Sequence, residues 1–223
     1  MIIPARFNGP PGSGNGGYTA GLVAGLVPGA GAVEVTLRVP PPLDTALSVV
    51  REAETLQVYD GSRLVAEALP VDPFETAVPP VSFEAATRAS ESYAGFAEHP
   101  FPTCFVCGPD REPGDGLRVF PGSVAGGGTA APWRVPDEVS PAMVWACLDC
   151  PGGWAIITPG RPYVMGRMAA RVAALPRPGD ACVVVGAAVA VRGRKADVHS
   201  TLYGPDGTPL ATARATWIAV PPT

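Results

Sequence analysis

Apolar and polar residues alternate over several short stretches, a pattern typical of strands that bury one face. In the clearest case, residues 33–39, valine and leucine alternate with glutamate, threonine and arginine until Pro40-Pro41-Pro42 ends the run. Further strands are predicted at 46–58, 63–69, 117–120, 129–135, 165–174, 181–192, 197–203 and 210–220. Glycine and proline lie mostly at the edges of these runs, so we expect short antiparallel strands joined by turns.

Two apolar segments without alternation predict helices. Residues 18–27 follow Asn15, a favourable N-cap, and end at Pro28-Gly29. Residues 142–150 follow Ser140-Pro141, a strong helix start, and end near Pro151-Gly152-Gly153. The proline-rich segment 70–100 has room for one more helix within 82–97 and is predicted to be a linker.

The two halves of the chain have the same order of elements: a capped helix, strands, an Asp-Gly turn and a final strand. The turns are Asp60-Gly61 and Asp206-Gly207. We therefore predict an α+β protein of two similar units, residues 1–75 and 101–223, with a linker at 76–100. Two unrelated stretches of a mixed sheet with helices remain the alternative.

Composition and charge narrow the class of protein. Apolar residues make up 47% of the 223 residues and charged residues 16%, which excludes a disordered chain despite 27 Gly and 28 Pro. The net charge of −4 comes without a basic stripe, so a nucleic acid partner is not expected. No apolar run approaches ~20 residues, and the first residues lack the order of a signal peptide. We expect a cytoplasmic protein that does not enter membranes and whose five cysteines are thiols.

The second predicted helix carries the residues of a family resemblance. Residues 144–153, Val-Trp-Ala-Cys-Leu-Asp-Cys-Pro-Gly-Gly, resemble the central helix of hotdog-fold acyl-CoA thioesterases such as the phenylacetyl-CoA and 4-hydroxybenzoyl-CoA enzymes. In those enzymes the helix opens with His-Gly-Gly, and the catalytic carboxylate follows the His by nine residues. Asp149 matches the acid, whereas Ser140-Pro141-Ala142 departs from the opening.

The first predicted helix shows the reverse. Asn15-Gly16-Gly17 resembles the His-Gly-Gly opening, but Ala24 stands in the position of the acid. Residues 104–117 are also similar to a Cys-x-x-Cys-Gly…Gly-Leu stretch that precedes the first strand in many thioesterase-like hotdog sequences. The resemblance implies a double hotdog, in which two antiparallel sheets, expected to be continuous, each wrap a central helix.

The resemblance also implies an active site shared between the units. The family places the helix start of one unit opposite the acid of the other, so Asn15, Gly16 and Gly17 would face Asp149. Backbone N–H groups at a helix start can stabilise an oxyanion, and a missing Cβ lets a thioester approach closely. Asp149 would attack the thioester or activate a water. The complementary pair, Ala142 and Ala24, has no acid. The predicted ligand is acyl-CoA or a similar small-molecule thioester, with no cofactor, and further self-association stays open.

Other interpretations of these residues remain. Asp149 could simply bond to backbone or solvent near its helix end, and Gly16-Gly17 could be an ordinary loop. The protein could then be a hotdog that binds an acyl thioester or small ligand without cleaving it. A dehydratase of this fold would use a histidine beside an acid, and neither predicted helix contains a histidine.

The cysteines and aromatic residues offer further alternatives. Two Cys-x-x-Cys pairs, Cys104 with Cys107 and Cys147 with Cys150, could form a zinc site, although cysteine on an apolar helix is an ordinary core residue. No metal is the preferred expectation. No thioredoxin-like order surrounds the first pair, and His99 and His199 suggest no catalytic constellation. Core packing is expected for the tryptophans, with an acyl pocket as the alternative: Trp133, Trp145, Trp154 and Trp217.

Overall fold

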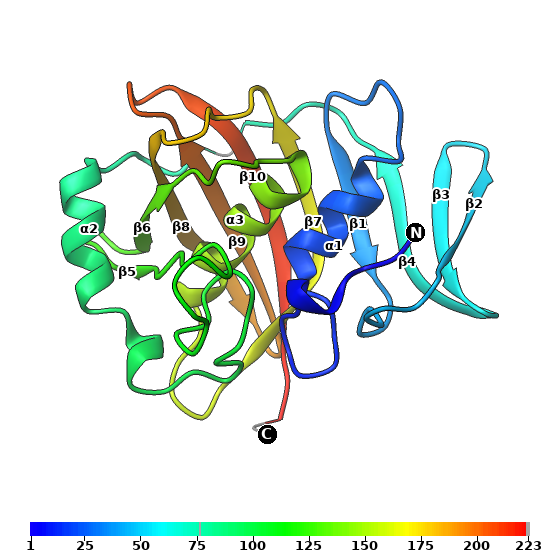
Figure 1. Ribbon diagram of the computed structural model, residues 1–223, viewed down its shortest axis with the longest axis horizontal. Helices are drawn as coiled ribbons and strands as arrows, with labels where there is room; N and C mark the ends of the chain where they lie inside the picture. The colour runs from blue at the N-terminus through cyan, green and yellow to red at the C-terminus, as the bar shows by residue number, and fades with distance from the viewer. Residues whose placement is uncertain (76, 222–223) are drawn as a thin grey trace.

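The computed structural model describes residues 1–75 and 77–221, and in these ranges ten strands form one antiparallel sheet (Figure 1). Thr76, where the predicted linker begins, lies outside the described residues, as do residues 222 and 223 at the end of the predicted second unit. The order of the strands across the sheet is β2-β3-β4-β1-β7-β10-β9-β8-β6-β5. Strands from the first part of the chain therefore occupy one side of the sheet and strands from the second part the other side.

The first unit contains one helix and four strands. Their bounds are α1 (Gly16–Ala24), β1 (Val33–Leu37), β2 (Ser48–Glu52), β3 (Thr55–Asp60) and β4 (Arg63–Pro70). The single strand predicted at 46–58 is wrong, because this stretch forms the β2–β3 hairpin. The chain turns at Ala53, whose φ of 53° lies outside the extended region.

The second unit contains the other six strands and the long helix. Their bounds are β5 (Gly122–Ser123), β6 (Thr129–Arg134), α3 (Pro141–Trp154), β7 (Tyr163–Val172), β8 (Ala181–Arg192), β9 (Lys195–Tyr203) and β10 (Pro209–Ala219). The strand predicted at 117–120 is wrong. Arg118 has a φ of 52°, so the backbone cannot stay extended there, although the N–H groups of Leu117 and Val119 donate to Phe105 and Val106 carbonyls.

The segment predicted as a linker carries the helix α2 (Phe83–Glu91), which packs against β6 and the short strand β5. Ser82 caps α2 by accepting a hydrogen bond from the Ala85 N–H. Two single 3₁₀ turns complete the helical segments of the described residues, at Ala5–Phe7 and Ala94–Phe96. The boundaries predicted for the two units and the linker, at residues 1–75, 76–100 and 101–223, stay a prediction.

The helix α3 continues through Pro151-Gly152-Gly153, where the sequence predicts its end. The two glycines serve close packing of the helix on the sheet. A Cβ on Gly152 would lie 2.6 Å from the Val198 side chain, and one on Gly153 would lie 2.5 Å from the Trp217 ring. Ser140 caps the start of α3 as predicted, accepting from the Met143 N–H at 3.3 Å.

The two units join through the pairing of β1 with β7, which makes the sheet continuous. The helices α1 and α3 lie side by side on the same face of this sheet (Figure 1). Their approach is close, because a Cβ on Gly21 would lie 2.6 Å from the Ala142 Cα. Apolar residues of both helices, such as Val23 and Leu148, belong to one continuous core. None of the helices in the described ranges has the length and apolar character needed to cross a membrane.

Candidate active site

Asp149 lies where the start of α1 meets the middle of α3. Its Oδ2 accepts a hydrogen bond from the Gly17 N–H at 2.9 Å and a longer one from the Asn15 Nδ2 at 3.4 Å. The structure thus brings together the carboxylate and the helix start that the sequence places 132 residues apart.

The absence of a side chain at Gly17 makes this contact possible. A Cβ there would lie 2.5 Å from the Asp149 Cβ and 2.7 Å from the Trp145 carbonyl oxygen. Both distances are below any that real Cβ atoms show, and one partner is rigid helix backbone. Any residue larger than glycine would push α1 away from α3 and lengthen the hydrogen bond to Asp149.

Asn15 is the N-cap of α1, as predicted, and is itself buried. Its Oδ1 accepts from the Tyr18 N–H at 2.8 Å, while its Nδ2 faces Asp149. The Gly17 N–H is already used by Asp149. Among the hydrogen bonds of the described residues, the Gly16 N–H has no acceptor, so it is the free donor at this helix start.

Asp149 is buried, with 3% of its surface exposed, and burial raises the pKa of its carboxyl group to about 7. The hydrogen bonds from Gly17 and Asn15 lower this pKa, and the charge of Cys104 raises it further. Within the described residues, Oδ1 of Asp149 has no hydrogen-bond partner. A buried carboxylate oxygen without a partner is costly to keep, which makes Asp149 a candidate for a role in reaction or binding.

The complementary pair without an acid lies at the other end of the helix contact. Ala24 and Ala142 are both buried, and the Ala142 Cα is the atom that a Cβ on Gly21 would approach. No acid is present at either position, so the pseudo-symmetric location carries no group for acid–base chemistry.

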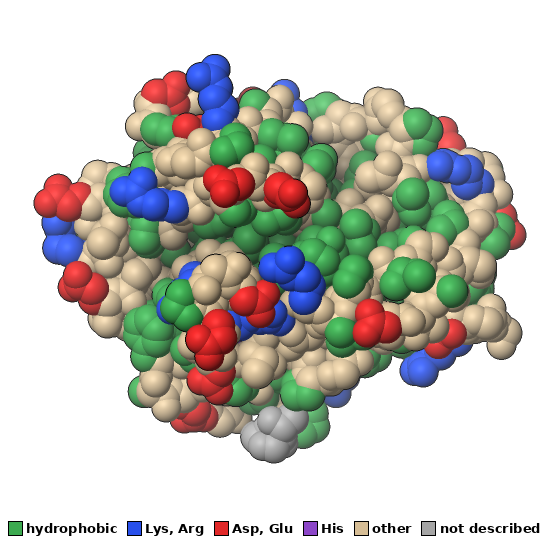
Figure 2. All heavy atoms as spheres, viewed as in Figure 1, with side chains coloured by type: hydrophobic (Ala, Val, Ile, Leu, Met, Phe, Trp, Pro, Cys, Tyr) green, Lys and Arg blue, Asp and Glu red, His purple; other side chains and the backbone are tan. Residues whose placement is uncertain are grey.

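A cavity of about 660 Å³ reaches this site, with Asn15, Gly16 and Asp149 in its wall. Most of the residues that line the cavity are apolar, and Trp154 and Trp217 are among them. All four tryptophans are buried in the core, as expected. Trp154 and Trp217 also line the cavity, so the acyl-pocket alternative stays open for these two. On the face drawn in Figure 2, hydrophobic side chains gather in a band across the middle, in front of α1 and α3 (compare Figure 1). A cavity of this size and character suits an apolar acyl group.

The cavity wall also holds three cysteines. The sulfur atoms of Cys104, Cys107 and Cys150 lie within 4.8 Å of one another. The four-cysteine zinc alternative needs correction, because Cys147 is not part of this group. It lies one helical turn before Cys150, and burial together with the nearby Cys182 thiol raises the pKa of Cys147.

Sequence reasoning missed His99. Its Nε2 lies 3.4 Å from the Cys107 sulfur, and the residue lines the same cavity. His99 lies outside every predicted helix and strand, so no periodicity connects it with the cysteines. The one available signal is its position eight residues before Cys107.

The fold and the junction of the two helices define a double hotdog. The crystal structure of a conserved protein of unknown function with a hot dog fold from Alicyclobacillus acidocaldarius is similar at a TM-score of 0.62 and 14% identity, covering 99% of this chain and 92% of that one. A structure of a putative thioesterase II from Thermobifida fusca is similar at a TM-score of 0.62 and 12% identity, covering 99% and 95% of the two chains. The tesB protein of Mycobacterium avium subsp. paratuberculosis is similar at a TM-score of 0.60 and 13% identity, covering 99% and 91%. No protein-family model matches the chain, and no curated protein matches its sequence.

Proposed function

We propose that the protein hydrolyses an acyl thioester, of acyl-CoA or an acyl carrier, at the junction of its two hotdog units. The observation that carries the proposal is the 2.9 Å hydrogen bond from the Gly17 N–H to the Asp149 carboxylate. It fixes an acid beside a helix start, in the wall of an apolar cavity. The fold is shared with proteins described as putative thioesterases, which agrees with this chemistry.

The free Gly16 N–H and the positive end of the α1 dipole are suited to the oxygen of the thioester carbonyl. Gly16 lines the cavity, and a Cβ there would lie 3.0 Å from the Met165 side chain and 3.5 Å from the Asp149 Oδ2, so a side chain at this position would crowd the site. As water adds to the carbonyl carbon, negative charge develops on this oxygen next to the free donor. The Gly17 N–H holds the carboxylate and does not contribute a second donor.

The unpartnered Oδ1 of Asp149 is suited to accept a proton from the attacking water. Hydroxide then bonds to the carbonyl carbon, the carbon–sulfur bond breaks, and the proton passes to the leaving thiolate. The products are a carboxylic acid and a free thiol. The acyl chain would occupy the apolar part of the cavity, between Trp154 and Trp217.

A second function, binding of an acyl thioester without cleavage, is favoured by the burial of Asp149. Its Oδ1 exposes almost no surface, so water reaches it only if the cavity wall moves. The two functions give opposite results when the protein is incubated with acyl-CoAs of different chain length and with aromatic acyl groups. Release of free thiol, followed with a thiol-reactive dye, supports hydrolysis. Saturable binding without thiol release at any chain length contradicts it.

A further inference from the structure

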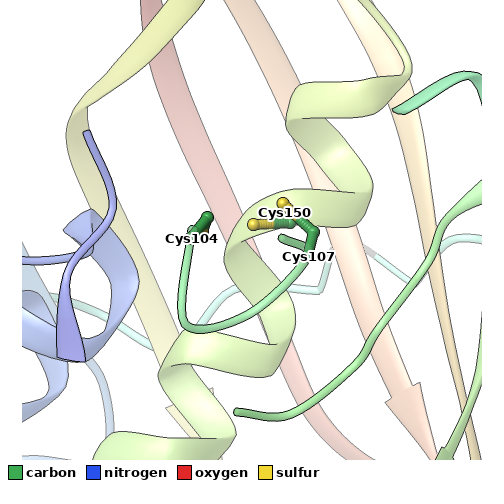
Figure 3. Close-up of side chains that lie close together, drawn as sticks. All are labelled: Cys104, Cys107 and Cys150. Carbon is green, nitrogen blue, oxygen red and sulfur yellow. The ribbon is translucent and has the colours of Figure 1, made fainter. Parts of the chain in front are cut away.

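Three cysteine sulfurs meet in the wall of the cavity, from two distant parts of the chain. Cys104 and Cys107 lie on the loop that crosses in front of α3, and Cys150 lies on α3 itself (Figure 3). All three residues are free thiols, less than 5% exposed, with their sulfurs within 4.8 Å of one another. Ordinary core packing gives no reason for three polarisable sulfurs to converge on one point.

The loop that carries the first two cysteines forms a tight turn from Pro102 to Gly108. The Gly108 N–H donates to the Cys104 carbonyl at 2.9 Å, and a Cβ on Gly108 would lie 2.4 Å from the Pro102 carbonyl oxygen. Only glycine fits this turn. The turn therefore brings the Cys104 and Cys107 sulfurs within 4.8 Å of each other.

Side-chain N–H groups also point at the sulfurs. The Trp154 Nε1 donates to the Cys107 sulfur at 3.4 Å, and the Asn15 Nδ2 lies 3.7 Å from the Cys104 sulfur. The His99 Nδ1 accepts from the Phe101 N–H at 2.9 Å, so in a neutral ring the proton is on Nε2, which faces the Cys107 sulfur. Neutral thiols are weak acceptors, whereas thiolates bound to a metal are commonly surrounded by such donors.

Several buried thiolates cannot coexist at one point without a positive charge between them. A tetrahedral Zn²⁺ ion with zinc–sulfur bonds of about 2.3 Å separates its sulfurs by about 3.8 Å, which fits inside the 4.8 Å limit of this group. Arg38 is the one lysine or arginine among the described residues that line the cavity. Arg111 lies over the Phe105 ring, but its guanidinium donates to the Thr103 carbonyl and to Asp115. A cation bound between the three sulfurs would supply the positive charge directly.

We infer that Cys104, Cys107 and Cys150 bind one Zn²⁺ ion as three thiolate ligands in the cavity wall. The fourth ligand is a water or a molecule from the cavity, because all three residues line it. His99 remains a hydrogen-bond donor to Cys107, since its Nδ1 is occupied by the Phe101 N–H. The ion links the loop of Cys104 to α3. The Asn15 Nδ2 contacts both the Cys104 sulfur and the Asp149 carboxylate, so one side chain connects the metal site with Asp149.

The test is the metal content of the full chain, produced in zinc-supplemented medium and purified without chelators. We expect about one zinc per chain, falling to less than about a tenth in Cys104→Ser and Cys150→Ser. Cys147→Ala is the matched control, because it changes a buried cysteine on the same helix outside the group, and it should keep the zinc. Melting curves establish that each variant is folded.

If the serine variants do not fold, wild-type protein still decides the question. Cobalt(II) added to reduced, metal-free wild-type protein should give the thiolate-to-cobalt charge-transfer absorption of a tetrahedral site, and zinc should displace it. Wild-type protein without zinc and without this absorption would overturn the site. Full zinc content in a folded Cys150→Ser variant would also overturn it, and so would loss of zinc from folded Cys147→Ala. Thiol release from acyl-CoA by wild-type protein tests the hydrolase proposal separately.

Discussion

The Gly17 N–H donates to the Asp149 Oδ2 at 2.9 Å, linking the first helix of one hotdog unit to the central helix of the other. The bond joins two incomplete sites. The first helix has a glycine start and Ala24 where an acid would be, and the second has the acid but begins Ser140-Pro141-Ala142. In the proposed function, the two helices together supply one set of groups for thioester chemistry.

The first prediction concerns the contact between the helices. Gly17→Ala should destabilise the protein by about 1–3 kcal/mol, because the new Cβ would lie 2.5 Å from the Asp149 Cβ and 2.7 Å from rigid backbone. Gly31→Ala is the control, since a Cβ there meets nothing within 4 Å. Denaturant unfolding of both variants gives the two free energies. Equal stabilities would mean that the helices are not packed this closely.

The second prediction concerns the pH dependence of stability in metal-free protein. Burial raises the pKa of Asp149 from 3.8 in the unfolded chain to about 7 in the folded protein. Its contribution is therefore fully present below pH 4 and is lost as the pH rises towards 7, because the folded state resists losing this proton. Relative to Asp149→Asn, the wild type should lose up to about 4 kcal/mol of unfolding free energy between these limits. Urea unfolding at several pH values measures the difference, and a constant difference would contradict the burial effect.

The third prediction concerns the part of the substrate beyond the thioester. Arg38 is the one lysine or arginine among the described residues that line the cavity, and its side chain is half exposed beside Glu67. If the substrate is a CoA thioester, Arg38→Gln should raise its KM about three- to tenfold at low salt, through loss of attraction to phosphate. The KM for a thioester of N-acetylcysteamine, which lacks phosphate, should not change.

The control for this prediction is Arg177→Gln, an exposed arginine outside the cavity lining. An equal rise in KM for both substrates, or for both variants, would show that Arg38 does not contact the phosphates. In that case an acyl carrier protein becomes the substrate to test next.

Much of the fold was predictable because the hydrophobic periodicity is strong. The alternation at 33–39 predicts β1 (Val33–Leu37), and the apolar run at 181–192 coincides with β8 (Ala181–Arg192). The caps Asn15 and Ser140 locate the starts of the two main helices, because a polar side chain before an apolar segment satisfies a free N–H.

The wrong predictions come from tertiary contacts that override local preference. Pro151-Gly152-Gly153 is typical of a helix end, yet α3 continues because these small residues let it approach the sheet. The apolar run 117–120 is typical of a strand, yet Arg118 adopts a positive φ and interrupts it. Neither effect is visible in local composition, since both depend on residues distant in sequence.

The candidate site was predictable where a family pattern supplied the spacing and hidden where only the fold brings residues together. Asp149 and Gly17 were expected to meet, and they do. The grouping of Cys150 with Cys104 and Cys107, and the contact of His99 with Cys107, depend on how the loop lies across α3. No spacing in the sequence distinguishes Cys150 from Cys147 as the third cysteine.

The most direct test of the composite site is the turnover of an acyl-CoA by Asp149→Asn beside its matched control. Asparagine keeps an oxygen that can accept from the Gly17 N–H, so the fold should be retained while the base is lost. Asp137→Asn makes the same change at an exposed position away from the cavity. The composite site predicts that kcat/KM falls at least about 100-fold in Asp149→Asn and is unchanged in Asp137→Asn. Undiminished turnover in folded Asp149→Asn would contradict it.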